Sequence, residues 1–176
     1  MEKTETVLAR FERLPGIAVE DMVGLWKGTG IPSGHPLDGV LENLGWFGKR
    51  FGPDMRADAL LFRTDEKRLL PIEPALIPLR LALRLGALGR TGMVASLFAY
   101  ARRFLRAKGT SAALQTASFG GVMSAAMAYD RQPILDHFRR IDENTVMGAM
   151  TIEGDSRLYF FQLTRLTPQE PPVAGG

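Results

Sequence analysis

The C-terminal third of the chain constrains the fold most, because it divides into five strand-like segments separated by short turns. Turns this short join antiparallel neighbours, whereas a parallel connection needs about a dozen residues or more. Gly, Asp, Asn and Pro supply the turn residues between the segments. We therefore predict an antiparallel meander of five strands, at Leu114–Phe119, Val122–Tyr129, Ile134–Ile141, Thr145–Ile152 and Leu158–Leu166.

A glycine-rich segment near the N-terminus predicts a further strand, at Leu25–Ile31. Side chains alternate between the two faces of a strand, so Trp26 shares its face with glycines alone. We expect these glycines to leave room around the indole. Trp26 either fills one end of a sheet core, as a buried aromatic usually does, or lines a cavity.

Three helical regions are predicted, at residues 2–13, 36–50 and 77–106. In the second, Pro36 suits the first position of a helix, and apolar residues then recur at helical spacing as far as Phe47. In the third, Thr91 is placed to cap a helix and Gly109 to end it. The last turn of that helix is expected to hold Arg102, Arg103 and Arg106. Two further strands are expected at 56–63 and 68–72, joined by a turn at 64–67.

These elements together predict a mainly β fold with added helices (α+β). It is an antiparallel β-barrel of about eight strands with a helical insertion, wide enough to hold one small ligand. Residues 1–166 form a single barrel domain, in which 20–75 precede the insertion at 77–106 and 112–166 form the meander. Residues 167–176 are rich in Pro and Gly and are expected to be a disordered tail.

Positive charge is concentrated in one part of the chain. The net charge is only +3, yet no Asp or Glu occurs between Glu73 and Asp130. Such a block attracts small anions, an anionic membrane surface or nucleic acid. Nucleic acid is disfavoured, because the block lacks aromatic side chains interleaved along a strand. We assign as membrane- or anion-binding residues Arg80, Arg84, Arg102, Arg103 and Arg106.

Several classes of protein are disfavoured by what the sequence lacks. The chain has no cysteine, which excludes disulfides and thiolate metal sites. Its N-terminus has no apolar signal-peptide region, and no uninterrupted apolar run reaches about 18 residues, the length of a membrane span. We therefore expect a cytoplasmic protein, peripheral to a membrane if the basic segment binds lipid.

Residues with catalytic chemistry do not form a recognisable constellation. Ser33, His35 and Asp38 resemble a triad only in composition, because a triad is recognised by its geometry. The two histidines lack the spacing of a zinc site, and neither glycine-rich nucleotide motif occurs. We assign no catalytic residue, no metal and no cofactor. His137 is either a hydrogen-bonded barrel residue or a group that binds haem iron or carries a proton.

Candidate ligand-binding residues are large or polar side chains that we expect at the barrel interior. Methionine fills irregular space and tolerates a changing occupant, although core packing alone also accounts for these positions. The candidates are Trp26, His35, Trp46, Lys49, Arg50, Met123, Met127, Tyr129, His137 and Met150.

Two longer motifs resemble a known family. The segments 24–28, 33–39 and 45–51 are similar to the bacterial GXWXG proteins. The run from Gly120 to Arg139 resembles the domain of unknown function that accompanies that motif. This resemblance implies a calycin-like barrel and a small hydrophobic ligand. The pattern G-x-W-x-G-x-G also resembles the start of the nitrobindins, which are haem barrels; that resemblance implies haem bound through His137.

Three functional hypotheses follow. In the first, the barrel binds a hydrophobic or acyl-type ligand such as a fatty acid, as a carrier or sensor near membranes, with His137, Lys49 or Arg50 at its polar end. In the second, His137 serves a nitrobindin-like haem protein or a small enzyme. In the third, the apolar segment 77–106 is an interface for a homodimer or another partner.

Overall fold

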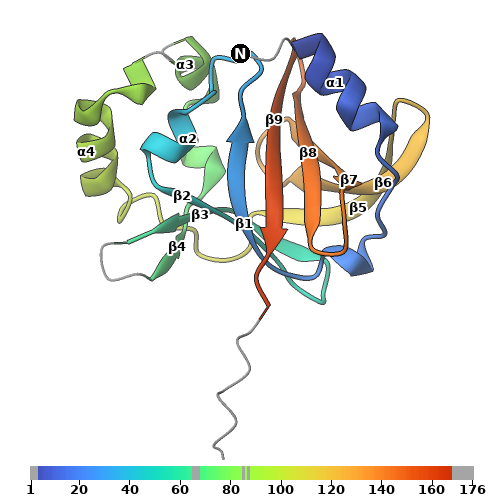
Figure 1. Ribbon diagram of the computed structural model, residues 1–176. Helices are drawn as coiled ribbons and strands as arrows, with labels where there is room; N and C mark the ends of the chain where they lie inside the picture. Colours follow the sequence, from blue (N-terminus) through green and yellow to red (C-terminus); the bar gives the residue numbers. More distant parts are fainter. Residues whose placement is uncertain (1–3, 65–67, 85, 87, 168–176) are drawn as a thin grey trace, which may run out of the picture.

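The computed structural model describes residues 4–64, 68–84, 86 and 88–167. Within these residues nine strands form one antiparallel sheet in the order β2-β1-β9-β8-β7-β6-β5-β3-β4, and a further pairing of β2 with β3 closes eight of them into a barrel (Figure 1). The predicted eight-stranded antiparallel barrel is therefore confirmed, with β4 as an extra strand at its edge. The strands are β1 (Gly24–Ile31), β2 (Trp46–Phe51), β3 (Arg56–Arg63), β4 (Leu69–Pro71), β5 (Ala112–Phe119), β6 (Val122–Tyr129), β7 (Ile134–Arg140), β8 (Thr145–Ile152) and β9 (Asp155–Arg165).

The five-stranded meander is confirmed almost residue by residue. Strands β6 and β8 have the predicted bounds, β5 and β7 differ by two and one residues at one end, and β9 begins three residues earlier and ends one residue earlier than predicted. Each strand pairs antiparallel with the next. Strand β9 then pairs with β1, so the glycine-rich strand joins the end of the meander. The predicted tail lies, except for Thr167, outside the described residues, as does most of the turn at 64–67.

The helix predicted at 36–50 is wrong. Only Val40–Asn43 is helical (α2), and Trp46–Phe51 is strand β2. Gly45 and Gly48 have φ angles of +80° and +150°, which a right-handed helix cannot contain. Glycine at position 48 also lets β2 approach β1, because a Cβ there would lie 2.0 Å from the carbonyl oxygen of Trp26. The register of β2 against β3 shifts on both sides of Gly48, so Trp46 and Lys49 both face the barrel interior although they lie three positions apart.

Among its described residues, the helical insertion contains two α-helices, α3 (Leu79–Arg84) and α4 (Gly92–Ala101), with the short 3-10 helix η3 (Leu88–Arg90) between them. Another 3-10 helix, η2 (Pro74–Leu76), lies just before the insertion. The predicted cap is confirmed, because the Thr91 hydroxyl accepts a hydrogen bond from the amide of Val94 at 3.4 Å. The predicted end is wrong: α4 stops at Ala101, so the three arginines follow the helix. Within the described residues, no helix combines the length and the hydropathy that crossing a bilayer would need.

Apolar side chains form two cores, one inside the barrel and one outside it. The helix α1 (Thr4–Arg13), predicted at 2–13, buries Val7 and Phe11 on the outer face of β8 and β9 (Figure 1). Inside the barrel, Trp26 is fully buried and its indole N–H donates to the carbonyl of Met22 at 2.7 Å. Trp26 is thus a core residue. The glycine beside it serves another tryptophan, because a Cβ on Gly28 would lie 2.2 Å from the Trp46 ring.

Candidate functional site

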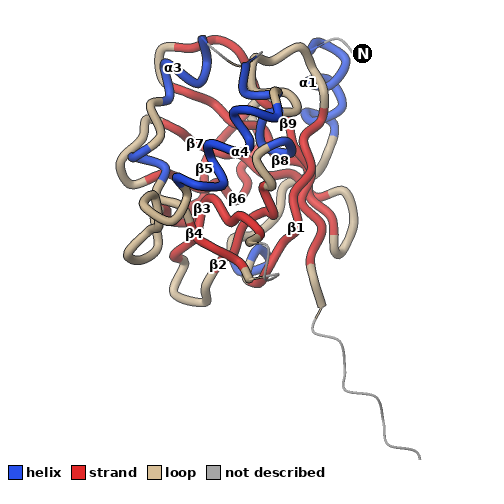
Figure 2. The backbone as a smooth tube through the Cα atoms, turned by 90° about the vertical axis from the view of Figure 1, so that its left-hand side faces the viewer, coloured by secondary structure: helices blue, strands red, loops and turns tan. Residues whose placement is uncertain are grey.

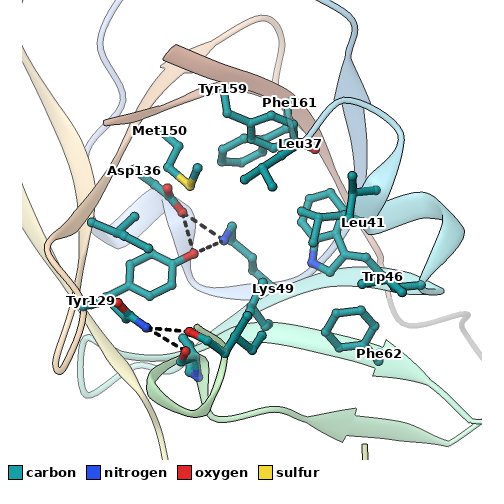
Figure 3. A pocket seen from close by; sticks show the side chains of 17 residues that line it. Leu37, Leu41, Trp46, Lys49, Phe62, Tyr129, Asp136, Met150, Tyr159 and Phe161 are labelled. Atoms are coloured by element: carbon teal, nitrogen blue, oxygen red, sulfur yellow. Dashed lines mark hydrogen bonds and ion pairs between the residues drawn. The ribbon is translucent and has the colours of Figure 1, made fainter. Parts of the chain in front are cut away.

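A cavity of about 120 Å³ lies inside the barrel, between its interior face and α2 (Figure 3). Leucines before, within and after α2 form one wall, and the aromatic rings of Trp46, Phe62 and Phe161 form another. At one end the Gln132 amide donates to the carbonyls of Pro74 and Ile77, at 2.9 and 3.3 Å, and so holds the start of the helical insertion against the barrel. Apart from a few polar groups, the surface of the cavity is apolar.

Three polar side chains meet at the cavity wall (Figure 3). Lys49 of β2 forms an ion pair with Asp136 of β7 at 2.9 Å, and both side chains are buried, with exposed fractions of 3% and 0%. The hydroxyl of Tyr129, at the end of β6, lies 3.1 Å from the Lys49 Nζ and 3.3 Å from Asp136 Oδ2. We call these three residues the polar cluster. Because β2 and β7 lie on different sides of the closed barrel, barrel closure brings the cluster together.

The hydrogen bonds of the polar cluster leave one specific group unused. Lys49 has three N–H donors, and three oxygens lie within reach: Asp136 Oδ2, the Tyr129 hydroxyl and the carbonyl of Ala59 at 3.0 Å. The Tyr129 hydroxyl then donates its own hydrogen to Asp136 Oδ2. Asp136 Oδ1, also buried, has no hydrogen-bond partner among the described residues. The cluster therefore offers a ligand an acceptor and no spare ammonium donor.

Aromatic rings surround the Lys49 ammonium, and burial keeps the Tyr129 hydroxyl protonated. The Lys49 ammonium lies 5.3, 5.5 and 5.9 Å from the ring centroids of Phe161, Tyr129 and Trp46, distances at which a ring face attracts a cation. Burial, and next to it the Asp136 carboxylate, raises the pKa of Tyr129 well above its ordinary value. The Tyr129 phenol therefore stays protonated at neutral pH and remains a donor to Asp136.

A second unpaired hydroxyl lies on the same wall. Tyr159 of β9 lines the cavity, and its buried hydroxyl has no hydrogen-bond partner among the described residues. Burial also raises the pKa of Tyr159, with a further contribution from Glu42. Tyr159 can therefore donate to, or accept from, a polar group of a bound molecule.

The loop with Ser33, His35 and Asp38 is structural rather than a triad. Asp38 Oδ2 accepts hydrogen bonds from three backbone amides, those of Ser33, Gly34 and His35, at 2.8, 2.7 and 3.0 Å. His35 Nδ1 accepts the amide of Leu37 at 3.1 Å, and its ring packs 5.5 Å from that of Tyr159. A triad needs the carboxylate on the imidazole, and here it holds the backbone of the loop instead.

The structure places the ten predicted ligand-binding residues in different surroundings. Four line the cavity: Trp46, Lys49, Tyr129 and Met150. Trp26 and Met127 are buried in the barrel core without lining the cavity, and His35 packs behind Tyr159. Arg50 points away from the barrel and pairs with Asp58 at 3.3 Å, and Met123 is 60% exposed.

The placement of His137 corrects the prediction that it faces a ligand. Neighbouring side chains on β7 alternate, and Asp136 occupies the interior face, so His137 lies on the outer face of the barrel. There its ring packs 4.8 Å from Phe119, beside the core that α1 covers. An imidazole in this position cannot reach the cavity, so haem bound there through His137 is not favoured.

Sequence reasoning missed Asp136, Tyr159, Phe161 and the leucines around α2 as cavity residues. A signal for Asp136 was present: it alternates with Ile134 and Phe138, so a carboxylate falls between two apolar side chains on one face of the strand. No such signal marks Tyr159, because its neighbours on β9 are also large and aromatic.

The two histidines predict a loss of stability in acid. Burial lowers the pKa of both His35 and His137 from the ordinary value of 6.5. Near this pH the unfolded chain takes up protons that the folded chain binds only at lower pH. The free energy of unfolding is therefore greatest above 6.5 and decreases below it. Urea denaturation on both sides of this value should give a lower midpoint in acid.

The matched control removes both histidines of the chain. In a His35→Gln/His137→Gln double variant, the decrease in midpoint below about pH 6.5 should become smaller. An unchanged pH dependence in the double variant would show that other groups cause it.

Comparisons with known proteins agree with this architecture. The family described as "GXWXG protein" matches residues 9–67, and "Domain of unknown function (DUF4334)" matches residues 110–165. A crystal structure of a protein from Thermomonospora curvata is similar, with a TM-score of 0.68 and 30% sequence identity over 93% of this chain and 87% of that chain. No curated protein matches. The chain thus belongs to the GXWXG family and carries the DUF4334 domain after its GXWXG segment.

Proposed function

We propose that the protein binds a small, neutral and mainly apolar molecule in the barrel cavity, and that a hydroxyl group of this molecule donates a hydrogen bond to Asp136. The unpaired Asp136 Oδ1 in an otherwise apolar cavity is the observation that carries the proposal. A buried acceptor without a donor costs free energy, and a ligand hydroxyl would supply the missing bond. This use of the barrel is in line with the calycin-like barrel that the resemblance to the GXWXG proteins implies.

The size of the cavity limits the ligand. A cavity of about 150 Å³ with apolar walls stays dry and binds benzene. The cavity here, at about 120 Å³, suits a group of similar size, such as one ring or a short branched chain. A long acyl chain would fit only by extending out of the cavity.

The charges of the polar cluster favour an alcohol over a carboxylic acid. Lys49 is already neutralised by Asp136, and all three of its N–H groups have partners. A ligand carboxylate would add a second negative charge beside Asp136, and an uncompensated buried charge costs several kcal/mol. Among hydrophobic and acyl-type ligands, the site therefore supports the neutral hydroxyl compound over the free fatty acid.

A set of three probes that share one ring tests the proposal by calorimetry. Benzyl alcohol carries the hydroxyl donor, toluene lacks it, and benzoate carries a carboxylate. A hydrogen bond to a charged group contributes about 1.5–3 kcal/mol, so benzyl alcohol should bind roughly tenfold to a hundredfold more tightly than toluene. Benzoate should bind more weakly than benzyl alcohol. Benzoate as the tightest probe would overturn the assignment of a neutral ligand, and no binding of any probe would overturn the proposed function.

A pair of tryptophan variants checks that binding occurs in the cavity. Met150→Trp fills the cavity and should abolish benzyl alcohol binding. Met123→Trp makes the same change at a side chain that is 60% exposed, and should leave the affinity unchanged. Equal binding by both variants would place the probe elsewhere.

A further inference from the structure

Large apolar side chains are exposed together on the helical insertion. Among the described residues, six of the eight exposed large hydrophobic side chains lie between Leu76 and Phe104. We call four of them, Met93, Leu97, Tyr100 and Phe104, the α4 surface; their exposed fractions run from 63% to 83%. A concentration of this kind marks a contact surface rather than scattered apolar residues.

The α4 helix is apolar on both of its faces. Its inner side packs on the barrel through Phe98, whose ring lies 4.9 Å from that of Phe62, a residue of the cavity wall. Its outer side carries Met93, Leu97 and Tyr100, which recur every three or four positions and so share one face of the helix. Phe104 follows in the turn after the helix, with its ring 6.4 Å from that of Tyr100. Figure 2 shows α4 on the outside of the molecule. No residue of α4 is buried, so the inner contact does not account for the outer face.

Arginines flank this apolar face along the chain. Arg80, Arg84, Arg90 and Arg106 are exposed on the segments before and after α4, and no acidic residue occurs anywhere from 74 to 129. Arg103 lies across two aromatic rings of the α4 surface, 4.3 Å from the centroid of Tyr100 and 4.8 Å from that of Phe104. Apolar and aromatic side chains with arginines around them are the composition of an interfacial helix on anionic lipid.

We infer that the α4 surface docks on an anionic lipid membrane, with Leu97 and Phe104 entering the acyl boundary and the surrounding arginines meeting the headgroups. A second copy of this chain fits the charge less well, because two such faces would bring two sets of arginines together. The surface adjoins the cavity wall through Phe98 and Phe62, which places the cavity near the membrane from which an apolar ligand would come. The inference rests on the exposed side chains and does not depend on what the cavity binds.

Co-sedimentation with vesicles tests the inference. The full chain should pellet with vesicles of phosphatidylglycerol mixed with phosphatidylcholine, bind much less to phosphatidylcholine alone, and be released as salt is added. A Leu97→Ser/Phe104→Ser variant should bind the mixed vesicles at least about tenfold more weakly than the wild type. The matched control is Met123→Ser, which changes an exposed apolar residue on β6 and should bind like the wild type. Thermal melts of all three chains check that they fold equally.

Each other outcome counts against the inference. Failure to pellet with either vesicle, or equal binding by the Leu97→Ser/Phe104→Ser variant, would overturn it. Light scattering on the same samples distinguishes membrane docking from the main alternative, a dimer of this chain. A dimer that becomes a monomer in this variant, without vesicle binding, would show that the α4 surface joins two copies of the chain.

Discussion

Gly48→Ala is expected to lower the free energy of unfolding by roughly 4 kcal/mol, the sum of an overpacking cost and a backbone strain cost. The new Cβ would lie 2.0 Å from the carbonyl oxygen of Trp26 and 2.8 Å from the amide nitrogen of Gly28. Both atoms belong to the backbone of β1, so no change of rotamer can relieve the contact. The φ angle of +150° adds strain for any residue with a side chain. Urea denaturation measures the loss.

Gly45→Ala is the matched control for this prediction. Gly45 also has a positive φ, +80°, but nothing lies within 4 Å of the position that its Cβ would take. The alanine there should cost only about 1 kcal/mol, the penalty for the left-handed backbone alone. Equal losses in the two variants would show that the contact between β1 and β2 does not control stability.

Gly48 also explains why the helix predicted at 36–50 is wrong. Apolar residues from Leu37 to Phe47 recur at helical spacing, and the predicted helix at 36–50 contains nothing that rejects a helix except Gly39, Gly45 and Gly48. A glycine lowers the stability of a helix by only about 1 kcal/mol relative to alanine, so glycines alone do not exclude a helix here. The deciding facts are the positive φ angles and the close approach of Gly48 to Trp26, and the second is a contact with β1 that a local pattern does not contain. In the meander, by contrast, short turns leave each strand little choice except to pair with the next.

Several residues of the candidate site could be predicted from the sequence, but their contacts with one another could not. Lys49, Tyr129, Trp46 and Met150 were expected at the barrel interior, and all four line the cavity. The partner of Lys49 was not predicted, because a helix at 36–50 leaves the direction of its side chain undetermined. The error with His137 has the same origin. Alternation on β7 separates it from Asp136, but only barrel closure decides which of the two faces is interior.

Lys49→Met is expected to destabilise the protein by about 3–5 kcal/mol, the usual cost of breaking a buried ion pair. The substitution leaves the Asp136 carboxylate fully buried without its cation. Asp136→Leu should cost a similar amount, because it leaves the ammonium of Lys49 unpaired between Ala59 and Tyr129. Urea denaturation of each variant at neutral pH measures both losses.

The Lys49→Met/Asp136→Leu double variant decides whether the two residues act as a pair. Removing both charges together leaves no uncompensated ion, so most of the stability should return. About 1 kcal/mol should stay lost, because the Tyr129 hydroxyl loses both of its partners. The double variant should also bind toluene and benzyl alcohol with similar affinity, since the acceptor Asp136 Oδ1 is gone and the apolar walls remain. Losses that simply add in the double variant would contradict the coupling. A retained preference for the alcohol would instead show that a group other than Asp136, with Tyr159 the first to test, receives the ligand hydroxyl.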